Sequence, residues 1–252
     1  MVWEYLERLR LLMADLAELK FQDYELQISC RARRARIKVT PLGKVVVVIP
    51  AGMDPAVVPR ILNDKQPWLQ RVLQRLTAKQ RNLPAAQSLQ PDRIILAALE
   101  EKWQVEYVSS QSSRPVVSES HRCLYLNQVI SASDNAGRLR QWLQQRARQT
   151  LPGWLHQVSE ELELSYERVQ IRGQKTRWGS CSSRGTISLN RNLLFLPAMT
   201  VRYLLIHELC HTRYMNHSSR FWQLVAGFMP DYRQHENNLR EATRNLPLWV
   251  YG

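Results

Sequence analysis

Several features that mark particular protein classes are scarce or absent in this 252-residue sequence. The first 20 residues contain acidic and basic side chains throughout, so they lack the unbroken apolar run of a signal peptide or a membrane span. No internal repeat recurs along the chain, which argues against solenoids and propellers. The sequence therefore predicts a cytoplasmic protein without a membrane partner, and it leaves the oligomeric state open.

Cysteine is also scarce. The four cysteines are Cys30, Cys123, Cys181 and Cys210, and no two of them show the two-residue gap of a zinc knuckle or a redox motif. Because thiols stay reduced in the cytoplasm, we expect all four to be free.

Acidic residues are few relative to basic ones. The chain has 35 Lys and Arg against 22 Asp and Glu, a formal net charge of +13. This excess favours an anionic partner such as nucleic acid or a nucleotide, although basic residues dispersed over a surface often serve solubility alone. The densest run, RARRARIK in residues 31–38, has five basic residues in eight positions.

Residues 25–50 predict a β-hairpin. The segments ELQISCRARRARIKVT and KVVVVIP are rich in β-branched residues and flank Pro41–Gly43, which is typical of a tight turn. On a strand, Arg34, Arg36 and Lys38 would share one face. A solvated hairpin face is the simpler interpretation of these residues, and a phosphate-binding stripe is the alternative.

Helical and strand patterns alternate over the rest of the chain. Amphipathic spacing predicts a helix over residues 1–20, and Asp54-Pro55 predicts the start of helical sequence that is interrupted near Pro67. Apolar runs in residues 93–108 and 121–130 predict a second small sheet. Helical spacing returns from Leu139 to Leu162, and we expect a break at Pro152-Gly153.

Three of the six histidines lie between His207 and His217, in the string VRYLLIHELCHTRYMNHSSRFW. Apolar residues at helical spacing predict that HELCH lies on a largely buried helix that starts near Pro197. Residues four apart on a helix differ by about 40° around the axis, so His207 and His211 point the same way. Two imidazoles so arranged can occupy two corners of a zinc tetrahedron.

Glu208 and His217 complete the predicted site. Glu208 follows His207 by one residue, so on the predicted helix it would lie close to the metal's water but turned away from direct ligation, as a general base requires. His217 follows His211 by six residues, and Met215-Asn216 can end the helix because Asn tolerates the left-handed conformation. The extended HExxHxxGxxH pattern has the same gap, with glycine where this chain has Tyr214.

The residues around this cluster have simpler expected roles. Ser218 or Ser219 can cap a further helix, whose Phe221 and Trp222 would pack against His217 and hold it in place. Three histidines and a water complete a tetrahedral site, so we expect Cys181 and Cys210 to be packing groups.

The sequence resembles the YgjP-like metallopeptidase family, a zincin-like group related to the SprT-like and WLM proteases. The resemblance rests on RARRARIKVTPLGKVVVVIP, RWGSCSSRGTISLNRNLLFLP and HELCHTRYMNHSSRFWQLVAGFMPDYR, and it extends from residue 22 onward. It implies Zn²⁺ bound by His207, His211 and His217, with Glu208 as the catalytic residue and no other cofactor.

The resemblance also implies an α+β fold, in which an active-site helix lies beside a small sheet and an N-terminal region containing a β-hairpin precedes it. We therefore expect three parts, namely an amphipathic helical extension over residues 1–22, an α+β region over residues 23–135, and a zincin-like catalytic region over residues 136–252.

The segment before the histidine helix supplies the candidate substrate contacts. In zincin-like folds this segment commonly forms a sheet edge beside the substrate, and ISLN is predicted to be that edge strand. The candidate substrate-binding residues are Arg177, Trp178, Gly179 and Ser180. Arg177 is suited to an anionic group or a polarised oxygen, whereas Trp178 is more often a core residue.

Three functions fit these residues. The leading one is hydrolysis of peptide bonds in a peptide or protein substrate, by a zinc-bound water that Glu208 activates. The second uses the same site on a nucleotide or other phosphate compound, with Arg172, Lys175 and Arg177 neutralising charge. The third is a basic nucleic-acid-binding module with structural zinc, which three protein ligands rather than four disfavour.

Overall fold

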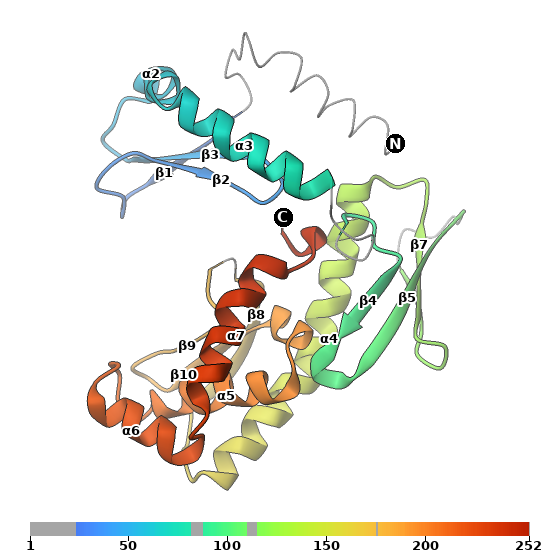
Figure 1. The fold of residues 1–252 in the computed structure, drawn as a ribbon, viewed down its shortest axis with the longest axis vertical. Helices are drawn as coiled ribbons and strands as arrows, with labels where there is room; N and C mark the ends of the chain where they lie inside the picture. The colour runs from blue at the N-terminus through green and yellow to red at the C-terminus, as the bar shows by residue number, and fades with distance from the viewer. Residues whose placement is uncertain (1–23, 82–87, 110–114, 175, 252) are drawn as a thin grey trace. The chain divides into compact units, whose positions relative to one another are not determined.

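The structure is a computed structural model that describes residues 24–81, 88–109, 115–174 and 176–251. The chain divides into two compact units between residues 84 and 85. We call the described residues up to 81 unit 1 and those from 88 to 250 unit 2. Together they contain six α-helices and three small sheets, so the predicted α+β class is confirmed (Figure 1). The helix predicted over residues 1–20 lies outside the described residues.

Unit 1 contains a three-stranded sheet. Its strands β1 (Tyr24–Ser29), β2 (Arg36–Val39) and β3 (Val45–Pro50) are ordered β1-β3-β2. β2 and β3 are antiparallel and form the predicted hairpin, whose turn uses Gly43 at a φ of 80°. β1 is a separate strand that runs parallel to β3. The predicted first strand was therefore too long, because the chain turns between residues 30 and 35.

Alternation of side chains along β3 places the core of unit 1 on one face of this sheet. Val45, Val47 and Ile49 are buried against the helical segment, which comprises the 3₁₀ turn η2 (Pro55–Val57), α2 (Val58–Asp64) and α3 (Gln66–Arg81). The Asp54 carboxylate caps η2 by accepting from the Ala56 N–H at 2.9 Å, as the Asp-Pro signal predicts. Figure 1 shows α3 lying across the sheet.

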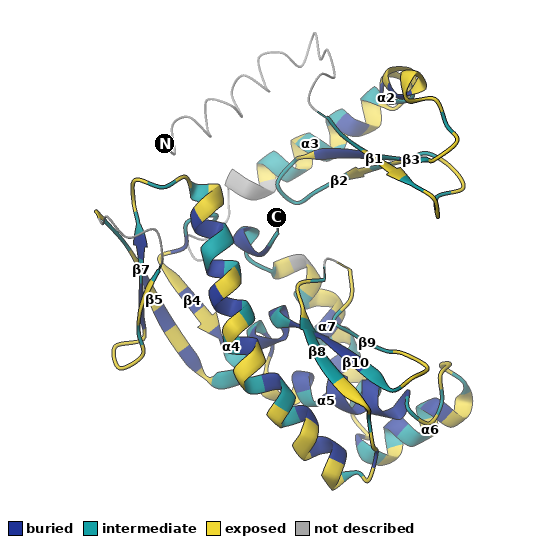
Figure 2. Cartoon of the chain, turned by 180° about the vertical axis from the view of Figure 1, so that it is seen from behind, coloured by how far each residue is buried: buried dark blue, intermediate teal, exposed yellow. Residues whose placement is uncertain are grey.

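Unit 2 begins with a four-stranded sheet, which confirms the predicted second sheet. Its strands β4 (Arg93–Leu96), β5 (Glu101–Val108), β6 (Val116–Ser118) and β7 (Cys123–Asn127) are ordered β4-β5-β7-β6. The 3₁₀ turn η4 (Ala97–Leu99) joins β4 to β5. Burial alternates along β5, so Trp103 and Val105 face the interior while Lys102 and Gln104 face solvent (Figure 2).

The long helix α4 (Ala132–Glu161) is continuous through Pro152, so the predicted break at this proline was wrong. Proline removes one backbone hydrogen bond from a helix. On either side of it, Leu151, Leu155 and Val158 are buried on one face, and this packing retains the helical path. In both views α4 lies between the four-stranded sheet and the second sheet of this unit (Figures 1 and 2).

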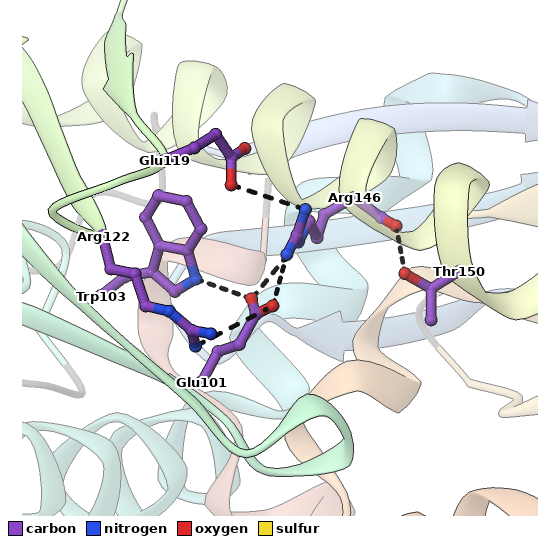
Figure 3. A network of polar contacts seen from close by, with 6 residues as sticks. All are labelled: Glu101, Trp103, Glu119, Arg122, Arg146 and Thr150. Atoms are coloured by element: carbon purple, nitrogen blue, oxygen red, sulfur yellow. Dashed lines mark hydrogen bonds and ion pairs between the residues drawn. The ribbon is translucent and has the colours of Figure 1, made fainter.

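A buried ion pair joins α4 to the four-stranded sheet (Figure 3). The Glu101 carboxylate accepts hydrogen bonds from the Arg146 guanidinium and, at 2.9 Å, from the Trp103 indole N–H. Arg146 also lies over the Trp103 ring, and Trp103 packs edge-on against Trp142 of α4 with ring centroids 5.1 Å apart. Hydrogen bonds to both carboxylate oxygens offset the cost of burying this charge.

The second sheet of unit 2 has the order β8-β10-β9, from β8 (Arg168–Arg172), β9 (Gly179–Cys181) and β10 (Thr186–Asn190). The predicted edge strand ISLN lies in β10, which pairs with a strand on each side, so that prediction was wrong. The central β10 is almost fully buried, whereas β8 and the three-residue β9 form the two edges. A central strand is buried on both faces because elements cover each of them.

From residue 191 onward unit 2 is helical. It contains the 3₁₀ turns η5 (Arg191–Phe195) and η6 (Leu248–Val250), and the helices α5 (Ala198–Cys210), α6 (Ser219–Phe228) and α7 (Tyr232–Asn245). α5 contacts α4, α6 and α7 as well as β9, which explains its nearly complete burial. None of the helices in the described ranges has the length and apolar character to cross a membrane.

Candidate metal centre and its cavity

The three clustered histidines meet at the end of α5. His207 lies in the last turn of this helix, His211 is its C-cap residue, and His217 precedes α6. One ring nitrogen from each residue lies within 4.8 Å of the other two, so the three could hold one metal ion. The Nε2 atoms of His207 and His217 are 3.1 Å apart. Two nitrogens that bind one tetrahedral zinc stand about 3.3 Å apart, close to the separation seen here.

Burial keeps the inner histidine rings neutral. Burial lowers the pKa of His207 to about 3, with a further contribution from the charges that His211 and His217 would carry. Burial likewise lowers the pKa of His211. Neutral imidazole is the form that binds a metal ion, so the surroundings of these rings prepare them as ligands near neutral pH.

The turn after α5 orients the second histidine. The Nδ1 atom of His211 lies 3.0 Å from the Tyr214 carbonyl oxygen, and a proton on Nδ1 would leave the Nε2 lone pair free for a metal. α5 ends at Cys210, earlier than Asn216, where we predicted its end. Neither Tyr214 nor Asn216 has a positive φ, so the predicted left-handed turn at Asn216 was wrong. Tyr214 therefore fits where the extended pattern has glycine, because this turn needs no left-handed residue.

Two aromatic side chains of α6 pack against the three histidine rings. The fully buried Phe221 lies within 5.0 Å, centroid to centroid, of all three histidine rings and stacks on His211 at 4.5 Å. Trp222 stacks on His217 at 5.5 Å. Both aromatic residues lie in the first turn of α6, in agreement with the predicted packing of α6 against His217.

Glu208 points its carboxylate toward β9. The residue is only 4% exposed, and its Oε2 atom is buried without a hydrogen-bond partner among the described residues. Burial raises the pKa of Glu208 to about 8, although the nearby Arg177 charge acts in the opposite direction. A Cβ atom on Gly179 would lie 2.5 Å from Glu208 Oε1. Glycine at position 179 is therefore required for the carboxylate to lie against this strand.

A cavity of about 430 Å³ opens beside the histidines and Glu208. His207, Glu208 and His217 line it together with Glu236 and Leu239 of α7. The cluster therefore faces an open space in which a ligand can approach both the carboxylate and the imidazoles.

The predicted substrate-binding residues divide into two groups. Arg177, Trp178 and Gly179 line the cavity, whereas Ser180 does not and instead pairs with Ser188 in β10. The Trp178 indole N–H donates to the Leu239 carbonyl and to Thr243 Oγ1, each at 3.1 Å. Trp178 thus attaches the segment before β9 to α7 as well as lining the cavity.

The other predicted basic residues lie elsewhere. The guanidinium of Arg172 donates to Gln170 Oε1 on the same strand, and Arg172 does not line the cavity. Lys175 lies outside the described residues. Of the described members of this group, Arg177 alone lines the cavity.

Sequence reasoning missed part of the cavity wall. Tyr203 and Leu204 line it from α5, four and three residues before His207, and this spacing on the helix was a signal that could have found them. Glu236 and Leu239 lie on α7, and no local pattern connects that helix to the histidines. Their place in the wall depends on how α7 packs on α5.

The cysteines near the site are not part of the histidine cluster in the described chain. Cys210 is fully buried, and burial raises the pKa of its thiol to about 12. Burial together with the Glu208 charge raises the pKa of Cys181 to about 11. Protonated thiols are poor metal ligands, which agrees with the expected packing role. All four cysteines are free.

Comparisons with known proteins identify the family of this chain. Residues 33–242 match the family described as YgjP-like, metallopeptidase domain. The crystal structure of the metallopeptidase zymogen of Pyrococcus abyssi abylysin is similar at 28% identity over 37% of this chain and 94% of that chain, with a TM-score of 0.34. No curated protein matches the chain. Because the family match covers most of the sequence, this chain belongs to the YgjP-like metallopeptidase family.

Proposed function

We propose that this chain is a zinc-dependent peptidase whose zincin-like catalytic region spans residues 136–252. The proposal rests above all on the convergence of three imidazoles beside an open cavity, which two of them, His207 and His217, line together with the buried carboxylate of Glu208. Membership of a metallopeptidase family makes a peptide or protein the expected substrate.

The donor set suits zinc in a catalytic site. His207, His211 and His217 would hold the ion, and three imidazoles with an open fourth position are a common arrangement in catalytic zinc sites. A structural zinc site would need a fourth protein ligand, and neither Cys181 nor Cys210 joins the cluster. When bound, zinc supplies a Lewis acid that polarises a carbonyl oxygen and lowers the pKa of water to about 7.

Glu208 is the proposed general base. Its Oε2 atom is buried and without a partner among the described residues, so in its ionised form it is available to accept a proton from the attacking water. The same carboxyl group then passes this proton to the leaving amine, which completes cleavage of the peptide bond. Gly179 gives the carboxylate room to lie beside the cavity.

The edge strand β9 is the proposed docking strand for the substrate. One side of β9 is hydrogen-bonded to β10, and in the strand order of this sheet no strand of the described chain follows on its other side. A peptide in extended conformation can add to such an edge by main-chain hydrogen bonds. Gly179 and Cys181 would be the pairing residues, because the backbone groups of Trp178 and Ser180 are turned toward β10. Arg177 would bind a carboxylate of the substrate or its polarised oxygen, and Trp178 would form an apolar wall.

The test separates metal binding from chemistry. Glu208→Gln should retain the metal, measured by elemental analysis, and should lose hydrolysis of an unstructured protein such as casein, because an amide cannot accept the proton. His217→Ala should lose both metal and activity. His156→Ala is the matched control, since His156 is exposed on α4 and lies outside the cluster. Full activity in Glu208→Gln would remove this residue from the mechanism, and normal metal content in His217→Ala would remove the third ligand.

A further inference from the structure

The positive charge of the chain is concentrated in unit 1. Residues 24–81 contain 12 Lys and Arg but only three Asp and Glu, which gives this segment a net charge of +9. Residues 85–250, nearly three times as long, contain 20 basic and 14 acidic residues and carry +6. The unit without the histidine cluster therefore has much the higher density of charge.

Five exposed side chains form the centre of this charge, and we call them the basic strip. Arg36 and Lys38 alternate along β2 with Ile37 and Val39, which pack against the core of unit 1, so the two cations point away from it. The remaining three lie in the connection between β1 and β2. The basic strip consists of Arg31, Arg33, Arg34, Arg36 and Lys38, all of which are exposed.

No acidic group of the described chain neutralises the basic strip. None of the ion pairs among the described residues involves its five side chains. Glu25 is the one acidic residue in the three strands, and Lys44 binds it at 2.6 Å. On β3, the register places Val48 opposite Arg36 and Val46 opposite Lys38. Like charges held together without a counter-charge repel one another, and a polyanion would relieve this repulsion.

We propose that the basic strip binds the sugar-phosphate backbone of nucleic acid. Four of its five residues are arginines, whose planar guanidinium groups bind phosphate oxygens in pairs. Residues on the same face of a strand are about 7 Å apart, so the cations of β2 form a linear series. A nucleic acid presents a linear series of phosphates, one every 3.4 Å or so along each strand of a duplex.

The composition of the basic strip favours nucleic acid over a lipid surface. The apolar residues between Arg31 and Lys38 are Ala32, Ala35 and Ile37, and each of these is partly buried. The exposed Ile28 lies on β1, at the other edge of the sheet from β2. Stable attachment to a membrane surface requires apolar side chains that enter the lipid as well as charge, and the basic strip has none exposed. It also has no aromatic residue to stack on bases, so binding depends on phosphates and is independent of base sequence.

The experiment measures binding of the full chain to fluorescent oligonucleotides of unrelated sequences, single-stranded and duplex, by anisotropy between 50 and 200 mM KCl. The protein should bind them with similar affinity, and log K should fall linearly with log [KCl]. Vesicles with and without phosphatidylserine, at the same salt concentrations, form the lipid arm of the experiment.

Two variants with the same net charge isolate the basic strip. The first changes all five of its residues to Gln. The second changes five exposed basic residues of unit 2 that have no ion pair in the described chain, namely Arg93, Lys102, Arg148, Arg168 and Arg184. Each variant lowers the formal net charge from +13 to +8. Circular dichroism and metal content establish that both remain folded.

The strip variant should bind at least about 100-fold more weakly at 50 mM KCl, and its salt slope should be smaller by about 3.5 to 4.5, because five phosphate contacts are lost. The unit 2 variant should stay within about threefold of the unchanged protein. Equal losses in the two variants would overturn the proposal, as would absence of binding at 50 mM KCl, or binding to phosphatidylserine vesicles but not to oligonucleotides. These readouts do not depend on peptidase activity.

Discussion

The two units use their charged residues in opposite ways. In unit 1 the basic side chains are exposed, and its described ion pair, Lys44 with Glu25, has side chains that are 61% and 40% exposed. In unit 2, ion pairs join elements that are distant in sequence, as Arg146 of α4 does with Glu101 of β5. An exposed pair contributes little to stability, whereas a buried pair with good hydrogen bonds is costly to break. Charge therefore supports the fold in unit 2 and remains available for a partner in unit 1.

The two units also differ in how tightly their side chains are packed. In unit 2, residues from β9, α5 and α6 meet around the histidines, and a Cβ atom in place of a Gly179 hydrogen would lie 2.5 Å from Glu208 Oε1. The basic strip of unit 1 has no such constraint, since its side chains extend into solvent. Substitutions should therefore have large effects near the histidines and small effects on the fold in the strip.

The largest effect is expected from Gly179→Ala. The new Cβ atom would lie 2.5 Å from Glu208 Oε1 and displace the carboxylate, so kcat for peptide hydrolysis should fall about 100-fold with metal content unchanged. Gly153→Ala in α4 is the matched control, because nothing lies within 4 Å of its Cβ position, and it should retain activity. Unchanged kcat in Gly179→Ala would show that Glu208 does not need its present position.

A smaller effect, on stability, is expected from removing one buried charge. Glu101→Gln should lower the free energy of unfolding of unit 2 by about 3 kcal/mol in urea titrations, because the largely buried Arg146 loses its nearest counter-ion and keeps only the exposed Glu119 at 3.7 Å. Glu25→Gln in unit 1 removes the same charge from an exposed pair and should cost less than about 1 kcal/mol. Similar losses in the two variants would contradict the distinction drawn between the units.

The smallest effect is a pH dependence. Burial alone would raise the pKa of Glu101, but hydrogen bonds from Arg146 and Trp103, with the charges of Arg146 and Arg122, lower it below the ordinary value of 4.5. The folded pKa is the lower one, so this stabilisation is fully present above the unfolded pKa and is lost as the pH falls through the folded value. The difference in unfolding free energy between the unchanged protein and Glu101→Gln should therefore shrink below about pH 4.5. A difference that stays constant from pH 6 to pH 3 would exclude this linkage.

Local sequence patterns correctly predicted several structural elements, including the helices on both sides of the histidine cluster. The turn at Pro41–Gly43, the start of α5 at Pro197 and the helix after Ser218 each follow from a few neighbouring residues. The spacing of His207, His211 and His217 likewise depends on short stretches of chain, and the structure brings all three together. Such signals are reliable because they reflect backbone preferences and side-chain direction within a few turns.

Predictions failed where distant residues compete with local preference. Pro152 is a local signal to break a helix, yet buried leucines on both sides keep α4 continuous. The ISLN strand looked like an edge, but the order of strands in a sheet depends on pairing between segments far apart in sequence. Asn216 was expected to end the histidine helix, and the helix ends earlier, where a turn returns the Tyr214 carbonyl to His211.

The sequence by itself determined the spacing of the three candidate metal ligands, the place of Glu208 beside the first of them and the concentration of charge in residues 24–81, because spacing and composition are properties of the chain before it folds. Only the tertiary structure decided that Gly179 makes room for Glu208, that α7 lines the cavity, and that the cations of the basic strip have no acidic partner in the described chain. Each of these depends on which distant segments pack together, and short-range preferences do not specify that packing.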